Sequence, residues 1–324
     1  MPKGIDPIGI PVGVVDSGVN YLLPKIASRL ARDPEGEILG YDYWDLDRRP
    51  FDVSPTPDPF YPGHHGTLTS SLVLAGAPVA KLVPYRYPRH AMARMAAVIE
   101  DASAHGVRVA NLSLDSADRE EWLPFRKAAE AHPEMLFVVA AGNHGRNIDQ
   151  QPVYPAAFTL ANMIVVTSAT ANGRLTYGVN WGPVSVDLLV RGEDVAALDF
   201  DGQRRAVSGS SYAAARVTAL AACLLAGHPD WSTTQLKAAI FGHAQPSEPG
   251  VAAEGFLPDS VLGGRHACDL ATTGGQATGL AGHAETSAVV IRSHGPDRGD
   301  VLTPRWRPGR GRSGRTPGSG RRWG

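Results

Sequence analysis

The chain has 324 residues and a formal net charge of −1 at pH 7, from 31 basic and 32 acidic side chains. A hydrophobic fraction of 43% with 19% charged residues is ordinary for a globular protein, and the length allows one large domain or two ordinary ones. No run approaches the roughly 18 apolar residues that span a bilayer, so we expect neither a membrane protein nor a membrane partner.

The first residues, 1–7, do not combine a basic region with an apolar core, so the sequence predicts no secretory signal. The two cysteines, Cys223 and Cys268, lack metal-ligand spacing, and Cys223 falls inside an apolar helical pattern that is typical of a core residue. We therefore expect no disulfide framework. Together these features favour a reducing, cytoplasmic location.

The charge is spread unevenly along the chain. From residue 292 to the end there are nine arginines and two aspartates, a net of +7, which leaves about −8 for the rest. This Gly/Arg/Pro-rich composition cannot bury enough apolar surface to fold. We therefore expect a folded domain over residues 1–270 and a disordered tail over 271–324. A passive tail is a better explanation than a nucleic-acid-binding one, so no nucleic acid partner is expected.

Strand-like and helix-like patterns alternate between about residues 10 and 245. Apolar strand patterns occur at 11–16, 107–114, 135–141 and 163–167, and helical patterns at 67–75, 92–105, 119–132, 211–225 and 233–243. Continuous apolar strands separated by helices predict an α/β fold, a doubly wound and mostly parallel sheet with helices on both faces. Residues 43–63 have no period and are interpreted as a long surface excursion.

Three polar residues end or follow the predicted strands. They are Asp16, Ser113 and Asn143, and ligands or catalytic groups collect at the carboxyl ends of parallel strands. An asparagine just past a buried strand can aim its side-chain amide at a developing oxyanion. The sequence therefore predicts a polar site at this edge of the sheet.

Ser211 opens an Ala/Leu-rich helical pattern, where unpaired backbone N–H groups and the positive end of the helix dipole collect. That position suits a nucleophile, although a serine there is more often only a helix cap. His65, which opens an earlier helix, can act as the base, and Asp16 can hold the imidazole in one tautomer. The sequence lacks the Gly-x-Gly-x-x-Gly pattern of dinucleotide-binding proteins and the Gly-x-Ser-x-Gly pattern of α/β-hydrolases.

These residues, in the chain order Asp16, His65, Asn143 and Ser211, resemble the subtilisin-like serine proteases (subtilases, peptidase S8). The matching segments are Val14 to Gly18, His65 to Thr67, Asn111 to Leu114, Ala141 to Asn143, Tyr154 to Ala156, Ile164 to Ala169 and Gly209 to Ala214. The resemblance implies a subtilisin-like fold in a monomeric serine endopeptidase that hydrolyses peptides or proteins. It assigns Asp16, His65 and Ser211 to the triad, Asn143 to the oxyanion hole, and Ser113 and Leu114 to backbone pairing with the substrate.

Several positions depart from the family pattern. Ser210 stands where the family has threonine, Tyr212 where it has methionine, and no proline follows near Ala215. These flanks motivate an alternative, a subtilisin-like fold kept as a weakly active or inactive binding or interaction module. The presence of all four chemical residues favours the enzyme.

Two further positions allow alternative interpretations. The register with Gly66 and Thr67 favours His65 over His64 as the base. Asp115 stands where the family commonly has glycine, and its carboxylate either faces solvent, the commoner case, or favours a basic substrate side chain. The family often binds calcium, but no set of ligand carboxylates matches here, so we expect no metal and no cofactor.

Overall fold

A computed structural model describes residues 1–53, 63–88, 90–262 and 268. Within them, eight strands form one parallel sheet in the order β10-β7-β6-β5-β4-β1-β3-β2. The strands are β1 Ile10–Asp16, β2 Tyr41–Asp42, β3 Ala80–Arg86, β4 Val109–Leu112, β5 Leu136–Ala140, β6 Met163–Ala169, β7 Leu188–Arg191 and β10 Gly255–Leu257. Strands β8 (Val195–Leu198) and β9 (Arg204–Val207) form a separate antiparallel hairpin.

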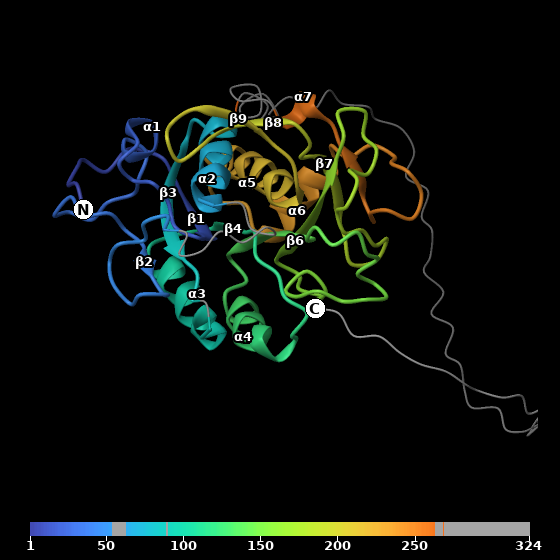
Figure 1. Ribbon diagram of the computed structural model, residues 1–324, viewed down its shortest axis with the longest axis horizontal. Coiled ribbons are helices and arrows are strands. Elements are labelled where there is room, and N and C mark those ends of the chain that lie inside the picture. Colours follow the sequence, from blue (N-terminus) through green and yellow to red (C-terminus); the bar gives the residue numbers. More distant parts are fainter. Residues whose placement is uncertain (54–62, 89, 263–267, 269–324) are drawn as a thin grey trace, which may run out of the picture. The chain divides into compact units, whose positions relative to one another are not determined.

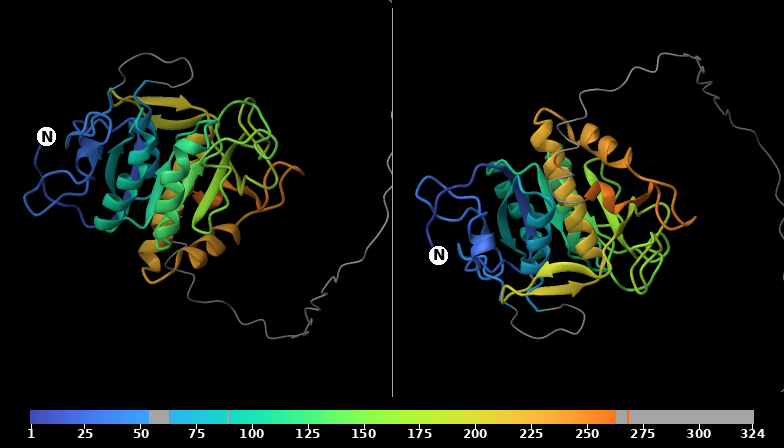
Figure 2. Two further views of the ribbon diagram at one scale, coloured as in Figure 1. Left: turned by 90° about the horizontal axis from the view of Figure 1, so that it is seen from below. Right: turned by 90° about the horizontal axis from the view of Figure 1, so that it is seen from above.

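Helices cover both faces of this sheet, with α2 and α5 above it and α3 and α4 below it in Figure 1. The helices are α1 Pro24–Ala27, α2 His65–Gly76, α3 Met95–Ala104, α4 Leu123–Ala131, α5 Ser210–Gly227, α6 Thr233–Phe241 and α7 Asp259–Leu262, with short 3₁₀ turns η1 Met92–Arg94 and η2 Glu120–Trp122. One buried apolar cluster packs α2, α5 and α6 against one face, and a second packs α3 and α4 against the other (Figure 2). The predicted doubly wound α/β fold is therefore confirmed.

The predicted elements differ from the observed ones mainly at their ends. The helical pattern at 119–132 divides into η2 and α4, where Pro124 lies at the start of the second helix. Strand β3 was not predicted, because Lys81, Pro84 and Arg86 interrupt its apolar pattern. The predicted domain boundary at residue 270 and the tail over 271–324 lie outside the described residues.

The strand order places a topological switch point between β1 and β4. The chain leaves β1 to form β3 on one side and returns to form β4 on the other. Connections therefore diverge at the carboxyl ends of these two strands, which is where open parallel sheets form a binding crevice. Asp16 ends β1 and Ser113 follows β4 directly, so both lie at this crevice.

Helices α2 and α5 run side by side in the same direction. At their beginnings, the rings of His65 and Tyr212 are 5.6 Å apart. Near the end of α2, a Cβ placed on Gly76 would lie 2.7 Å from Cβ of Ala219, so the small residues permit close packing. Because α5 packs across β4, β5 and β6, this pairing brings the first turns of both helices to the carboxyl edge of the sheet.

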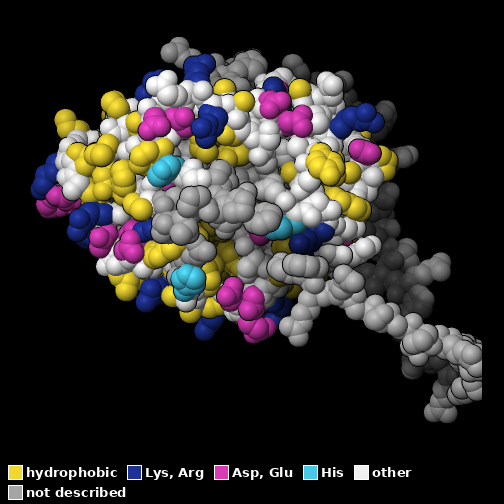
Figure 3. All heavy atoms as spheres, in the orientation of Figure 1, with side chains coloured by type: hydrophobic (Ala, Val, Ile, Leu, Met, Phe, Trp, Pro, Cys, Tyr) yellow, Lys and Arg dark blue, Asp and Glu magenta, His cyan; other side chains and the backbone are white. Residues whose placement is uncertain are grey.

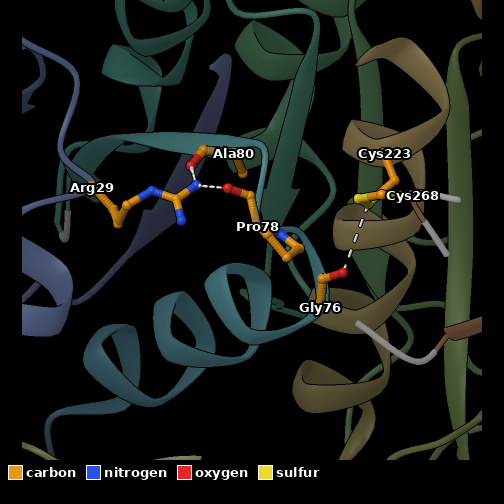
Figure 4. Close-up of a disulfide and its surroundings, with 6 residues drawn as sticks. All are labelled: Arg29, Gly76, Pro78, Ala80, Cys223 and Cys268. Carbon is orange, nitrogen blue, oxygen red and sulfur yellow. Dashed lines mark hydrogen bonds between the residues drawn. A yellow bond between two sulfur atoms is a disulfide. The ribbon is translucent and has the colours of Figure 1, made fainter. Parts of the chain in front are cut away.

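The sequence predicted no disulfide framework, and this expectation was wrong, because Cys223 and Cys268 form a disulfide (Figure 4). Cys223 is fully buried in α5, as predicted for a core residue, and its sulfur lies 3.7 Å from the carbonyl oxygen of Gly76. The sequence separation of 45 residues gave no sign that the later segment returns to this helix. The cysteines therefore give no support to the expected reducing, cytoplasmic location.

Helix α5 is the one helix among the described residues that is long and apolar enough, by composition, to cross a bilayer. However, 83% of it is buried inside the protein, as expected of the central helix of a core. Around this core, Figure 3 shows basic and acidic side chains interspersed on the visible face, in agreement with the near-neutral net charge.

Candidate active site

Asp16 is fully buried at the end of the central strand β1. Its Oδ1 accepts a hydrogen bond from the Ser17 N–H at 2.7 Å and lies 2.8 Å from Nδ1 of His65. Its Oδ2 lies 3.0 Å from the same nitrogen and accepts a hydrogen bond from Oγ1 of Thr69 at 3.1 Å. Three neighbours therefore fix the carboxylate before any ligand is present.

His65 is the first residue of α2, and Gly66 allows that helix to start directly against the end of β1. A Cβ placed on Gly66 would lie only 2.0 Å from the carbonyl oxygen of Gly18. His64 instead turns away, with its ring stacked at 3.7 Å on Phe200 and its Nδ1 2.8 Å from the carbonyl oxygen of Asp52. The structure thus brings His65, and not His64, to Asp16.

The surroundings of His65 raise its pKa. Burial alone lowers the pKa, but the charge and hydrogen bond of Asp16, with a smaller contribution from the charge of Asp52, raise it above its ordinary value. The contact between Nδ1 and Asp16 fixes the proton of a neutral imidazole on Nδ1. Nε2 is then the nitrogen that can accept a proton.

Asp52 forms a second, fully buried carboxylate behind this pair. It accepts hydrogen bonds from Oγ of Ser17 at 2.7 Å and from the N–H of Thr67 at 2.8 Å. Ser17 Oγ also accepts the Gly66 N–H at 2.8 Å, so the network joins the end of β1 to the start of α2. Burial raises the pKa of Asp52, and the hydrogen bonds from Thr67 and Ser17 oppose that rise.

Ser211 is the second residue of α5 and is 6% exposed. Within the described part of the chain, its N–H donates to no acceptor. The neighbouring Ser210 is fully engaged, because its Oγ accepts the Gly142 N–H at 3.1 Å and donates to Oδ1 of Asn143 at 3.1 Å. Of the two serines, Ser211 is therefore the one whose hydroxyl is not committed to this bridge.

Asn143 lies in the loop after β5, and its amide has a fixed orientation. The Ser210 N–H donates to its Oδ1 at 2.9 Å, so Nδ2 is the end that can donate to a ligand. The buried Asn180 holds the same loop, since its Oδ1 accepts the His144 and Arg146 N–H groups at 2.9 and 3.2 Å. Its Nδ2 donates to the carbonyl oxygen of Ala141 at 2.7 Å.

A cleft of about 460 Å³ collects most of these groups. It is lined mainly by residues 142–144, 176–179 and 208–212, together with His65, Ser113 and Asp115. Ser113 is buried, and its Oγ donates to the carbonyl oxygen of Ser211 at 3.4 Å. The side chain of Leu114 does not line the cleft but packs in the core on the α3 and α4 side of the sheet.

One sequence-predicted residue lies in a different environment from the favoured one, and two residues of the site were missed. Asp115 does not simply face solvent, because it is half-buried and lines the cleft. Asp52 lies within residues 43–63, which the sequence indicated only as a long surface excursion. No feature of the sequence singled out Asn180. Their signal is only that each is a polar residue beside an apolar one, which is too weak to find them from sequence.

Among the described residues, no three His, Cys, Asp or Glu side chains converge to hold a metal ion.

Comparison with known proteins shows the family to which this chain belongs. The pattern of the Subtilase family matches residues 8–283. The chain is 26% identical over 230 residues to a thermophilic serine proteinase of Bacillus sp. (strain AK1), covering 67% of this chain and 52% of that protein. It is 27% identical over 248 residues to alkaline serine exoprotease A of Vibrio alginolyticus, covering 74% of this chain and 42% of that protein. The chain thus spans about half the length of these curated relatives.

Solved structures show the same fold at lower identity. A cold-adapted subtilisin-like serine proteinase superposes with a TM-score of 0.63 at 22% identity, covering 79% of this chain and 91% of that one. The epidermin leader peptide processing serine protease of Staphylococcus aureus superposes with a TM-score of 0.65 at 17% identity, covering 84% of this chain and 77% of that one. With the family pattern matched over most of its length, the chain belongs to the subtilase family.

Proposed function

We propose that this protein is a serine endopeptidase that uses Ser211 as nucleophile, His65 as general base and Asp16 as the group that orients the imidazole. The observation that carries the proposal is the buried contact of His65 Nδ1 with Asp16 at 2.8 Å, in a helix that starts beside the first turn of α5. The membership of the subtilase family, whose curated relatives are serine proteases, supports the same chemistry.

In the first half of the reaction, Nε2 of His65 takes the proton of Ser211 Oγ as that oxygen bonds to the scissile carbonyl carbon. The carbonyl oxygen becomes an oxyanion and receives hydrogen bonds from Nδ2 of Asn143 and from the Ser211 N–H. The C–N bond then breaks, and His65 returns the proton to the leaving amine. Water completes the cycle by attacking the acyl ester, with His65 again acting as base and then as acid.

The substrate in this proposal is a peptide or protein segment that lies along the crevice at the carboxyl ends of β1 and β4. Ser113 and Leu114 immediately follow β4, and we assign their backbone to pairing with the extended substrate. The buried side chains of both residues hold that segment in place, since Ser113 contacts Ser211 and Leu114 packs in the core.

Labelling with an active-site-directed fluorophosphonate tests the proposal directly. We expect one label on Ser211, lost in Ser211→Ala and retained in Ser210→Ala, the matched control on the adjacent serine. Peptide hydrolysis should fall by about 10⁶-fold in Ser211→Ala. A folded wild-type protein that takes no label and cleaves no peptide would instead support the alternative of a binding module.

A further inference from the structure

Asp115 is the one carboxylate among the described residues that line the cleft. It follows β4 by three residues and lies on the wall formed with residues 142–144. Asp16 and Asp52 lie deeper, behind His65, and neither lines the cleft. From the described residues, the cleft therefore presents one negative charge, that of Asp115, to a bound substrate.

The carboxylate of Asp115 lies against the backbone next to the oxyanion donor. A Cβ placed on Gly142 would be 2.4 Å from Oδ2 of Asp115, and Gly142 has a φ of 94°, a conformation that favours glycine. The carboxylate thus packs where a side chain at position 142 would otherwise stand. The next residue along the chain is Asn143, so the charge lies beside the position proposed for the attacked carbonyl.

No described residue donates a hydrogen bond to Asp115 or forms an ion pair with it. Burial raises its pKa, while the charges of His144 and Arg146 lower it without reaching ion-pair distance. These two are the charges that act on its pKa; His144 lines the cleft, whereas Arg146 lines only a neighbouring depression. A half-buried carboxylate without a donor is costly, and a cation that entered the cleft would relieve that cost.

We propose that Asp115 selects substrates with lysine or arginine at the residue whose carbonyl Ser211 attacks. This inference rests on the proposed endopeptidase function. The α-carbon of that residue is bonded to the attacked carbonyl carbon, so its side chain starts beside the wall that carries Asp115. A long cationic side chain can follow this wall and place its charge on the carboxylate, whereas an acidic one meets a like charge in a partly desolvated site.

The test compares two fluorogenic peptides that differ only in arginine or citrulline at the cleaved residue. Citrulline keeps the length and shape of arginine but has no charge. For the wild-type enzyme we expect a kcat/KM about 10- to 100-fold higher for the arginine peptide, the size of a charge-assisted hydrogen bond in a partly buried site. Asp115→Asn should bring the ratio close to one, and Asp230→Asn, which removes an exposed carboxylate outside the cleft, should keep it.

The outcomes separate the two proposals. Equal rates for both peptides in a wild-type enzyme that takes the fluorophosphonate label would overturn the role of Asp115 alone. A preference for arginine that survives unchanged in Asp115→Asn would overturn it as well. Absence of both labelling and cleavage would overturn the proposed function together with this inference. Because the wild-type comparison needs no variant, the inference remains testable even if Asp115→Asn does not fold.

Discussion

Asp16 and Asp115 are two carboxylates at the same edge of the sheet, and their surroundings are opposite. Asp16 is fully buried and receives or shares hydrogen bonds with Ser17, His65 and Thr69. Asp115 is half-buried and has no hydrogen-bonding partner among the described residues. A carboxylate that is satisfied inside the protein can only orient its neighbours, whereas an unsatisfied one at a cleft has its charge available for a ligand.

The largest expected effect separates these two carboxylates most sharply. Asp16→Ala should lower kcat by about 10⁴-fold, because the imidazole loses the group that fixes its tautomer and stabilises its charge. The loss should be the same for arginine and citrulline peptides, in contrast to Asp115→Asn. Steady-state kinetics on both peptides measure this, with Asp230→Ala as a surface control. A loss restricted to the arginine peptide would contradict the orienting role of Asp16.

The next effect concerns the oxyanion donor that lies between the two carboxylates. Asn143→Ala should lower kcat by about 10²- to 10³-fold and leave KM nearly unchanged, since the amide is needed only when the oxyanion forms. The measurement is kcat and KM on one cleaved peptide, with intact mass and thermal unfolding to verify folding. An increase in KM with unchanged kcat would show that Asn143 binds substrate instead of the oxyanion.

The smallest effect concerns Asp52, the buried carboxylate that lies behind Asp16 and His65 and whose charge acts on His65. The activity of the wild-type enzyme should fall as pH drops through the pKa of His65, which lies above its ordinary value of about 6.5, because only neutral imidazole accepts a proton. Asp52→Asn removes a negative charge that contributes to this raised pKa, so the acid limb of kcat/KM should move to lower pH.

At neutral pH, Asp52→Asn should lower kcat/KM by less than ~10²-fold, which is the loss that a 1 Å misplacement of a reacting group can cause. The control is Asp47→Asn, a partly exposed carboxylate of the same excursion that pairs with Arg49 instead of with the site. A pH profile of kcat/KM for the three proteins measures the shift. An acid limb that stays in place or moves to higher pH would show that Asp52 does not act on His65.

The fold could be predicted because its signals are local. Continuous apolar runs such as 135–141 and 163–167 specify strands that are buried on both faces, and the alternating helices then require a doubly wound sheet. The site residues Asp16 and Asn143 could be placed at strand ends for the same reason. Strand β3 escaped prediction because Lys81 and Pro84 disturb the pattern that identifies a buried strand.

Contacts between distant segments could not be predicted, since no period or spacing relates their residues. Asp52 lies in a segment without regular structure, and only the fold brings it under Ser17 and Thr67. Asn180 follows Asn143 by 37 residues and holds its loop through backbone hydrogen bonds. The disulfide of Cys223 with Cys268 was missed for the same reason.

The sequence by itself determined the class of fold, the family resemblance and the identity of the candidate residues Asp16, His65, Asn143 and Ser211, because residue type and short-range order carry that information. The tertiary structure decided which polar side chains have hydrogen-bond partners inside the protein and which can contact a ligand. It committed the hydroxyl of Ser210 to a bridge, turned His64 away, and left Asp115 half-buried in the cleft. Hydrogen-bond satisfaction depends on partners from several strands and helices, and those partners meet only in the folded chain.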